Sequence, residues 1–113
     1  MSSLSTHVLD AVTGDPAVDV AVRLERRGGR PPGPWTPVAD ARTDGDGRVR
    51  DLTPAGLEPG VHRLVFDTAG YFAGSGQRGF YPEVVICFEV TTERHYHVPL
   101  LLSPYAFSTY RGS

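Results

Sequence analysis

Lysine and asparagine are absent from this chain of 113 residues, and cysteine, methionine and tryptophan occur once each. A single cysteine cannot form a disulfide within the chain, which excludes a disulfide-stapled scaffold. All 11 basic residues are arginine, and 13 acidic residues bring the net charge to −2. Nucleic-acid-binding proteins usually carry a basic excess, so we expect no nucleic-acid partner.

Long apolar runs are also missing. The two richest stretches are Val84–Phe88 and Val98–Leu102, far shorter than the roughly 18 residues of a membrane-spanning helix. Residues Met1–Leu4 have neither the basic region nor the apolar stretch of a secretory signal. We therefore expect a cytoplasmic protein that binds no membrane. The length predicts a single domain over residues 1–113.

The 13 glycines and 10 prolines divide the chain into short runs, a spacing typical of an all-β sandwich. The clearest run is Val18–Leu24, in which every second residue is apolar, so one face of a strand is predicted to be buried. The predicted strands are Leu4–Asp10, Val18–Leu24, Trp35–Arg42, Arg48–Leu52, Gly60–Asp67, Pro82–Val90, Arg94–Leu102 and Tyr105–Arg111, and the one predicted helix is Thr68–Gly74. We therefore expect two packed antiparallel sheets.

Two segments carry more specific expectations. Apolar side chains alternate onto both faces of Pro82–Val90, which predicts a central strand with Cys87 as a buried apolar side chain. The loop Gly28–Pro34 is too rich in glycine and proline for a regular element to cross it.

Two ligand-binding motifs match in their letters but not in their context. Gly74–Gly79 has the spacing G-x-G-x-x-G, but a proline and a strand follow it where a dinucleotide-binding loop needs a helix. Asp44–Gly47 resembles part of a calcium loop, but its alignment places Arg42 and Thr53 where carboxylates are required. We therefore expect no cofactor.

His95 and His97 are the most informative local feature. Residues two apart on a strand project from the same face, and the alternate residues from Tyr96 to Leu102 form the more apolar face. The two histidines therefore lie outside the core. Leu101 shares their face and suits a wet surface poorly, so we expect a second subunit to cover it.

Several uses of this histidine pair stay open. His-x-His occurs in zinc sites, and His7 could supply a third ligand. Imidazole also titrates near working pH, which suits acid–base chemistry. A hydrogen-bonding histidine without chemistry is the third interpretation, and it is the one we adopt for His62.

Three segments resemble the 5-hydroxyisourate hydrolases, the transthyretin-related proteins. Ser5–Asp10, followed by Thr13-Gly14, is similar to their first signature, and Asp46–Arg48 resembles their central arginine motif. His95–Ser113 is similar to their C-terminal signature almost throughout. In this family the ending Tyr110-Arg111-Gly112-Ser113 separates the hydrolases from the hormone carrier transthyretin.

The resemblance implies a transthyretin-like β-sandwich that forms a homotetramer with active sites at the dimer–dimer interface. It implies hydrolysis of the cyclic amide 5-hydroxyisourate, formed by urate oxidation, to 2-oxo-4-hydroxy-4-carboxy-5-ureidoimidazoline, with no metal. The motifs carry over His7, Arg48, His97 and Ser113 as catalytic residues, and His7, Arg48, Tyr110, Arg111 and Gly112 as substrate-binding residues.

Opening a cyclic amide with water needs a base and stabilisation of an oxyanion. Neutral imidazole of His97 or His7 can be the base, and the planar guanidinium of Arg48 can stabilise negative charge. Tyr110 and Ser113 would hold the substrate ring. No activated serine nucleophile is evident, which favours direct attack by water.

Besides a plain β-sandwich interaction module without turnover, two alternatives to this hydrolase remain. One is a transthyretin-like carrier of a small ligand, because a shared fold does not fix function. The other is a zinc-dependent hydrolase that uses His7, His95 and His97 as ligands.

Overall fold

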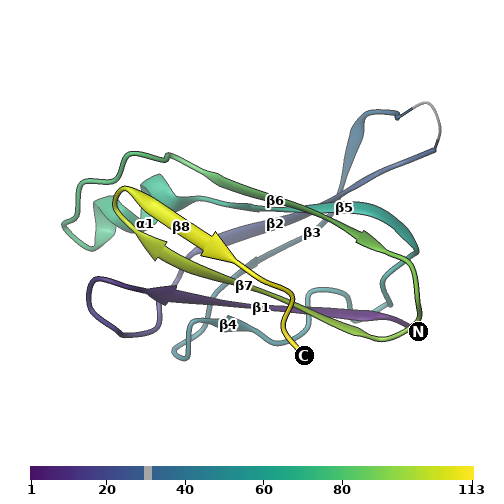
Figure 1. Cartoon of the computed structure of the whole chain (residues 1–113), viewed down its shortest axis with the longest axis horizontal. Helices are drawn as coiled ribbons and strands as arrows, with labels where there is room; N and C mark the ends of the chain where they lie inside the picture. Colours follow the sequence, from purple (N-terminus) through teal and green to yellow (C-terminus); the bar gives the residue numbers. More distant parts are fainter. Residues whose placement is uncertain (30–31) are drawn as a thin grey trace.

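A computed structural model describes residues 1–29 and 32–113, and in them eight strands form two four-stranded sheets beside one short helix (Figure 1). The elements are β1 (Ser3–Asp10), β2 (Ala21–Arg27), β3 (Trp35–Arg42), β4 (Arg48–Val49), β5 (Gly60–Phe66), α1 (Thr68–Gly74), β6 (Val84–Val90), β7 (His95–Ser103) and β8 (Ala106–Thr109). The sheet orders are β4-β1-β7-β8 and β3-β2-β5-β6. The predicted all-β sandwich and its one helix are confirmed.

The core lies between the two sheets because side chains alternate along each strand. On β1 the buried positions are Leu4, Thr6, Val8 and Asp10, and on β7 the apolar face from Tyr96 to Leu102 is buried as predicted. Leu24, Leu64 and Phe66 of the other sheet are fully buried. Each such side chain contributes about 1.5–3 kcal/mol to folding.

Strands β1 and β7 pair in parallel, whereas the other pairs of strands are antiparallel. In this register Ser5 lies opposite His97, and His7 lies opposite Pro99. The expected antiparallel sheets therefore contain one parallel pair, which joins the two histidine-bearing strands from opposite ends of the sequence.

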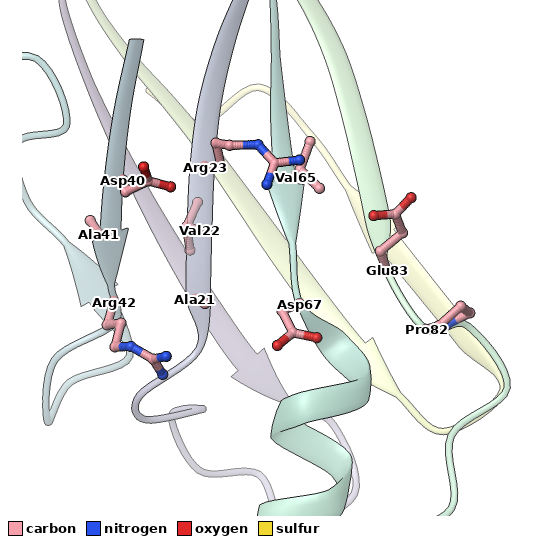
Figure 2. A pocket seen from close by; sticks show the side chains of 10 residues that line it. All are labelled: Ala21, Val22, Arg23, Asp40, Ala41, Arg42, Val65, Asp67, Pro82 and Glu83. Atoms are coloured by element: carbon pink, nitrogen blue, oxygen red, sulfur yellow. The ribbon is translucent and has the colours of Figure 1, made fainter. Parts of the chain in front are cut away.

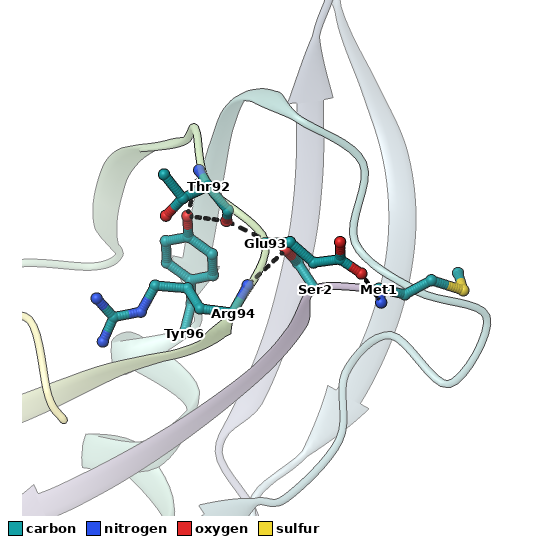
Figure 3. Close-up of polar contacts among 6 residues, drawn as sticks. All are labelled: Met1, Ser2, Thr92, Glu93, Arg94 and Tyr96. Atoms are coloured by element: carbon teal, nitrogen blue, oxygen red, sulfur yellow. Dashed lines mark hydrogen bonds and ion pairs between the residues drawn. The ribbon is translucent and has the colours of Figure 1, made fainter.

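The start of β1 is fixed to the turn between β6 and β7 (Figure 3). The Ser2 hydroxyl accepts a hydrogen bond from the Arg94 amide at 3.1 Å and donates to the Thr92 carbonyl. The Tyr96 hydroxyl closes the same turn by donating to the Thr92 carbonyl at 2.7 Å. The Met1 ammonium pairs with the Glu93 carboxylate.

The end of β1 is held by the carboxylate of Asp10, which is only 2% exposed. One of its oxygens accepts from the Tyr71 hydroxyl at 2.6 Å and from the Gln77 amide at 2.9 Å. The other accepts from the backbone amides of Val12 and Thr13. Asp10 thus joins β1, the turn after it and helix α1.

Two expectations about the second sheet are wrong. Strand β2 begins at Ala21 rather than Val18, because Asp19 adopts a left-handed backbone (φ 63°) that interrupts the extended run and leaves Val18 exposed. Strand β6 is an edge strand and not a central one, so Val85 and Cys87 on its outer face are exposed.

Other boundaries also differ. Strands β4 and β8 are shorter than predicted, and each lies at an edge of its sheet. Within the predicted loop Gly28–Pro34, residues 30 and 31 lie outside the described residues. No helix in the described part of the chain has the length and apolar character to cross a membrane.

The turn before β4 is specified by Asp44 and Gly47. One Asp44 carboxylate oxygen accepts from the amides of Asp46 at 2.8 Å and Arg48 at 3.0 Å. Gly47 has φ +72°, and its carbonyl accepts from the Val8 amide at 2.8 Å. A Cβ on Gly47 would lie 2.6 Å from the Val8 carbonyl oxygen. Only glycine therefore lets this turn approach β1 so closely.

We expect Gly47→Ala to lower the free energy of unfolding by about 1–3 kcal/mol, the usual cost of a side chain in a disfavoured backbone region. Gly45→Ala in the same turn is the matched control, because a Cβ there meets no atom within 4 Å. Urea denaturation of both variants measures the difference. Equal stabilities would contradict the close approach.

Candidate active site

Three of the four predicted catalytic residues, all but Ser113, gather on the outer face of the sheet β4-β1-β7-β8. His7 projects from β1 and lies opposite Arg48 of β4 in the antiparallel register. His97 projects from the neighbouring strand β7, opposite Ser5. All three side chains are half-buried. The Asp44–Gly47 turn, which holds the Arg48 amide, sets Arg48 beside His7.

Serine and histidine side chains alternate beside this group. The Ser5 hydroxyl lies 2.7 Å from Nδ1 of His97 and 2.8 Å from Nε2 of His95. The Ser3 hydroxyl lies 2.6 Å from Nδ1 of His95. The contact between the Ser5 hydroxyl and Nδ1 of His97 orients the His97 ring. It leaves Nε2 of His97 as the nitrogen available to another partner.

The C-terminal tail returns to β7 after β8 ends at Thr109 (Figure 1). The Gly112 amide donates to the His97 carbonyl at 2.8 Å, and a Cβ on Gly112 would lie 2.5 Å from Cδ2 of the His97 ring. The tail therefore packs directly on His97, and the exposed Ser113 follows it.

Tyr110 and Arg111 are placed differently from the other predicted site residues. Within one chain they line a separate hollow of about 360 Å³ at the open edge between the sheets, together with Tyr96 and Val98. Tyr110 is 61% exposed. The structure thus brings His7, Arg48, His97 and Gly112 together, and leaves Tyr110 and Arg111 outside this group.

Both histidines of the group are held in the neutral form at neutral pH. Burial, followed by the positive charge of Arg48, lowers the pKa of His7 below its usual value, although Asp44 and Asp46 oppose this shift. Burial also lowers the pKa of His97, with further contributions from Arg48, His7 and His95. Neutral imidazole can accept a proton, so both rings are candidate bases.

A hollow of about 120 Å³ beside this group is lined by Ser5 and Arg48, together with Thr6, Val49 and Arg50. A larger hollow, of about 620 Å³, lies on the outer face of the other sheet (Figure 2). Three of its five charged residues already have structural partners, since Asp67 caps helix α1, Arg42 pairs with Asp19 and Arg23 pairs with Glu25. The chemistry of these side chains therefore favours the group of His7, Arg48 and His97, rather than the larger hollow, as the candidate active site.

The zinc interpretation finds little support in the arrangement of the rings. Across residues 1–29 and 32–113, no three His, Cys, Asp or Glu side chains come close enough together to hold a metal ion. Ser5 lies between His95 and His97 and contacts both.

His62, interpreted as a hydrogen-bonding histidine, is buried, and its Nδ1 lies 3.1 Å from the Gly60 carbonyl.

Ser3 and Ser5 belong to the site although the sequence did not predict a role for either side chain. Their spacing with His7 offered a signal, because Ser3, Ser5 and His7 fall on one face of a single strand. Their contacts with the histidines also require the parallel register of β1 and β7, which side-chain alternation does not specify.

We expect Arg48→Met to raise the pKa of both His7 and His97, because it removes a positive charge that disfavours imidazolium. NMR titration of the imidazole carbons measures each pKa. His62 is the internal control, since its pKa is lowered by burial and by Arg26. A variant in which His7 and His97 titrate as in the wild type would refute the placement of Arg48.

Known proteins share both the sequence and the fold. The chain is 45% identical over 114 residues to the 5-hydroxyisourate hydrolase of Mus musculus, covering 99% of this chain and 96% of that protein. The 5-hydroxyisourate hydrolase structure of Klebsiella pneumoniae has a TM-score of 0.88 at 37% identity and covers 100% of both chains. Sea bream transthyretin in complex with thyroxine has a TM-score of 0.89 at 35% identity, covering 96% of this chain and 93% of that one. Residues 4–112 match the model of the HIUase/Transthyretin family, and the chain belongs to that family.

Proposed function

We propose that this chain, as one hydrolase domain over residues 1–113, opens 5-hydroxyisourate with water in urate degradation. The observation that carries the proposal is the meeting of His7, Arg48 and His97 on one sheet face. These residues come from three segments that each resemble a hydrolase motif. A cytoplasmic location stays a prediction, which fractionation of the source cells would test.

In this mechanism His97 is the general base. Its Nδ1 is engaged by Ser5, so Nε2 takes a proton from the attacking water. The lowered pKa of His97 keeps this nitrogen unprotonated at neutral pH. His7 is also neutral, and it orients the water or a carbonyl of the substrate from the adjacent strand.

Arg48 stabilises the negative charge that develops on the attacked carbonyl oxygen. Its guanidinium presents several donors in one plane, which matches the oxygens of a flat, polar ring. Asp44 and Gly47 fix the backbone beneath it, so the Arg48 side chain starts from a fixed point opposite His7. A carrier of an apolar ligand would gain little from such a polar group.

Turnover tests the proposal directly. Urate oxidase generates 5-hydroxyisourate in the cuvette, and we expect this protein to accelerate its decay in the ultraviolet spectrum. Arg48→Lys should reduce turnover about a hundredfold or more, the scale of losing one preorganised donor, because lysine lacks the planar fork. Arg42→Lys, on the other sheet, is the control. Decay no faster than the spontaneous rate would disprove the proposed activity.

We further propose that Ser113 takes part in catalysis, with Tyr110, Arg111 and Gly112 binding substrate. The contact between Gly112 and the His97 ring supports this role. A hexahistidine tag after Ser113 should sharply reduce turnover, whereas the same tag before Met1 should be tolerated. Circular dichroism must first show that both proteins fold. Equal activity of the two would remove Ser113 from the site.

A homotetramer with active sites at the dimer–dimer interface completes the proposal. Leu9 and Leu101 face each other on the same outer surface as the histidines and stay partly exposed in one chain. A second copy would bury them and bring other side chains, including a second Tyr110, within reach of the site. Light scattering should report four chains. A fully active monomer would contradict this assembly.

A further inference from the structure

An unbroken row of polar side chains crosses strands β1 and β7 in the order Ser3, His95, Ser5, His97. The three contacts along it are 2.6 Å, 2.8 Å and 2.7 Å long. One end is the half-buried His97, and His95, next to Ser3 at the other end, is exposed in a single chain. The hydrolysis proposed above gives a role in proton transfer only to His97.

Hydrogen-bond chemistry restricts where the protons of this row can lie. A hydroxyl has one proton, so Ser5 donates to one imidazole nitrogen and accepts from the other. In the first arrangement, Nδ1 of His97 donates to Ser5, Ser5 donates to Nε2 of His95, and Nδ1 of His95 donates to Ser3. The second arrangement reverses every donor and acceptor and places the proton of His97 on Nε2. Both rings are neutral in each arrangement.

We propose that Ser5 and His95 are positioning residues that relay a proton between His97 and solvent, a role that rests on the proposed hydrolysis. In the first arrangement Nε2 of His97 is bare and accepts the proton of the attacking water. As that N–H bond forms, the Nδ1 proton of His97 passes to Ser5, and the hydroxyl proton of Ser5 passes to Nε2 of His95. His95 then releases its Nδ1 proton to solvent, directly or through Ser3.

This passage balances, because each ring and the Ser5 hydroxyl gain one proton and give up another, each ring from its other nitrogen, and the row ends in the second arrangement. His97 is then neutral and carries the former water proton on Nε2. It can donate this proton to the ring nitrogen that leaves when the amide opens. The reverse passage takes one proton from solvent and restores the first arrangement.

The surroundings of His97 favour passing the proton on. Arg48 on β4, His7 on β1 and His95 on β7 are the charged and titratable groups that act on it, and with burial they hold its pKa low. An imidazolium formed there would face a fixed positive charge in a partly buried site. The relay avoids this state, since charge leaves the row at the exposed His95.

Three variants separate the relay from simple packing. Ser5→Ala should lower kcat about ten- to a hundredfold with little change in KM, the usual cost of removing the group that orients a functional histidine. Ser5→Thr keeps the hydroxyl and suits a strand, so it should retain most of the rate. His95→Gln keeps a hydrogen-bonding group but cannot transfer a proton between two nitrogens, so it should lose rate as Ser5→Ala does. Ser103→Ala, which removes a β7 hydroxyl bonded to Ala106, is the matched control.

Two further readouts do not respond to packing alone. In mixtures of H₂O and D₂O, the wild-type rate should depend non-linearly on the deuterium fraction, because several protons move together, and His95→Gln should make this dependence linear. Nitrogen NMR of the free protein should show His97 protonated at Nδ1, with a changed tautomer ratio in Ser5→Ala.

The outcomes also distinguish the relay from the hydrolysis on which it rests. A wild-type protein that does not accelerate 5-hydroxyisourate decay overturns both. If the wild type turns over, then a full rate in Ser5→Ala or His95→Gln, or identical His97 nitrogen shifts in wild type and Ser5→Ala, overturns the relay alone.

Discussion

The parallel register of β1 against β7 is the constraint on which the site depends. It sets Ser5 opposite His97, and it brings His7 into the same face. A slip of one residue would turn every side chain of β1 to the opposite face, moving His7 into the core and Leu4 into solvent. Ser2 fixes this register at one end through its bonds to the turn before β7, and the buried Asp10 holds the other end of β1 against helix α1.

The alternation of side chains along β1 and β7 places the groups that stabilise the fold on the inner face and the groups available for chemistry on the outer face. The inner face of β1 and β7 is buried and mostly apolar, with Thr6 and Asp10 as its polar members, and it packs against the second sheet. The outer face carries hydroxyl, imidazole and guanidinium groups that the core does not need. Burial on this face is only partial, yet together with Arg48 it is enough to hold the pKa of His7 and His97 low. Two neutral rings beside a permanent cation are suited to accepting protons and stabilising an anion.

Much of this organisation could be predicted from sequence. Strict alternation from Tyr96 to Leu102 correctly separated the buried face of β7 from its histidine face, because period two is a local property of a strand. Local alternation gave wrong predictions of burial where the path of the chain and the order of the strands determine which side chains are covered. Val18 continued the apolar pattern of β2, but the left-handed turn at Asp19 exposes it. Val84–Val90 has apolar residues on both faces, yet it lies at a sheet edge.

The remaining features of the site depend on long-range pairing. Ser5 is separated from His97 by 92 positions along the chain, and the contact of Gly112 with the His97 ring depends on the path of the tail. Family resemblance identified His7, Arg48 and His97 as residues that belong together, but neither resemblance nor alternation specified that Ser5 contacts both His95 and His97. Those contacts follow only from the order and direction of the strands.

The central claim is that a neutral imidazole held beside Arg48 takes the proton of the attacking water. The pH dependence of kcat/KM for 5-hydroxyisourate tests it most directly, after subtraction of the spontaneous decay at each pH. We expect kcat/KM to fall on acidification with a midpoint below the usual imidazole pKa of about 6.5, and this midpoint should coincide with the pKa of His97 measured by NMR. A value of kcat/KM that stays constant while the NMR signal of His97 shows complete protonation would contradict the claim.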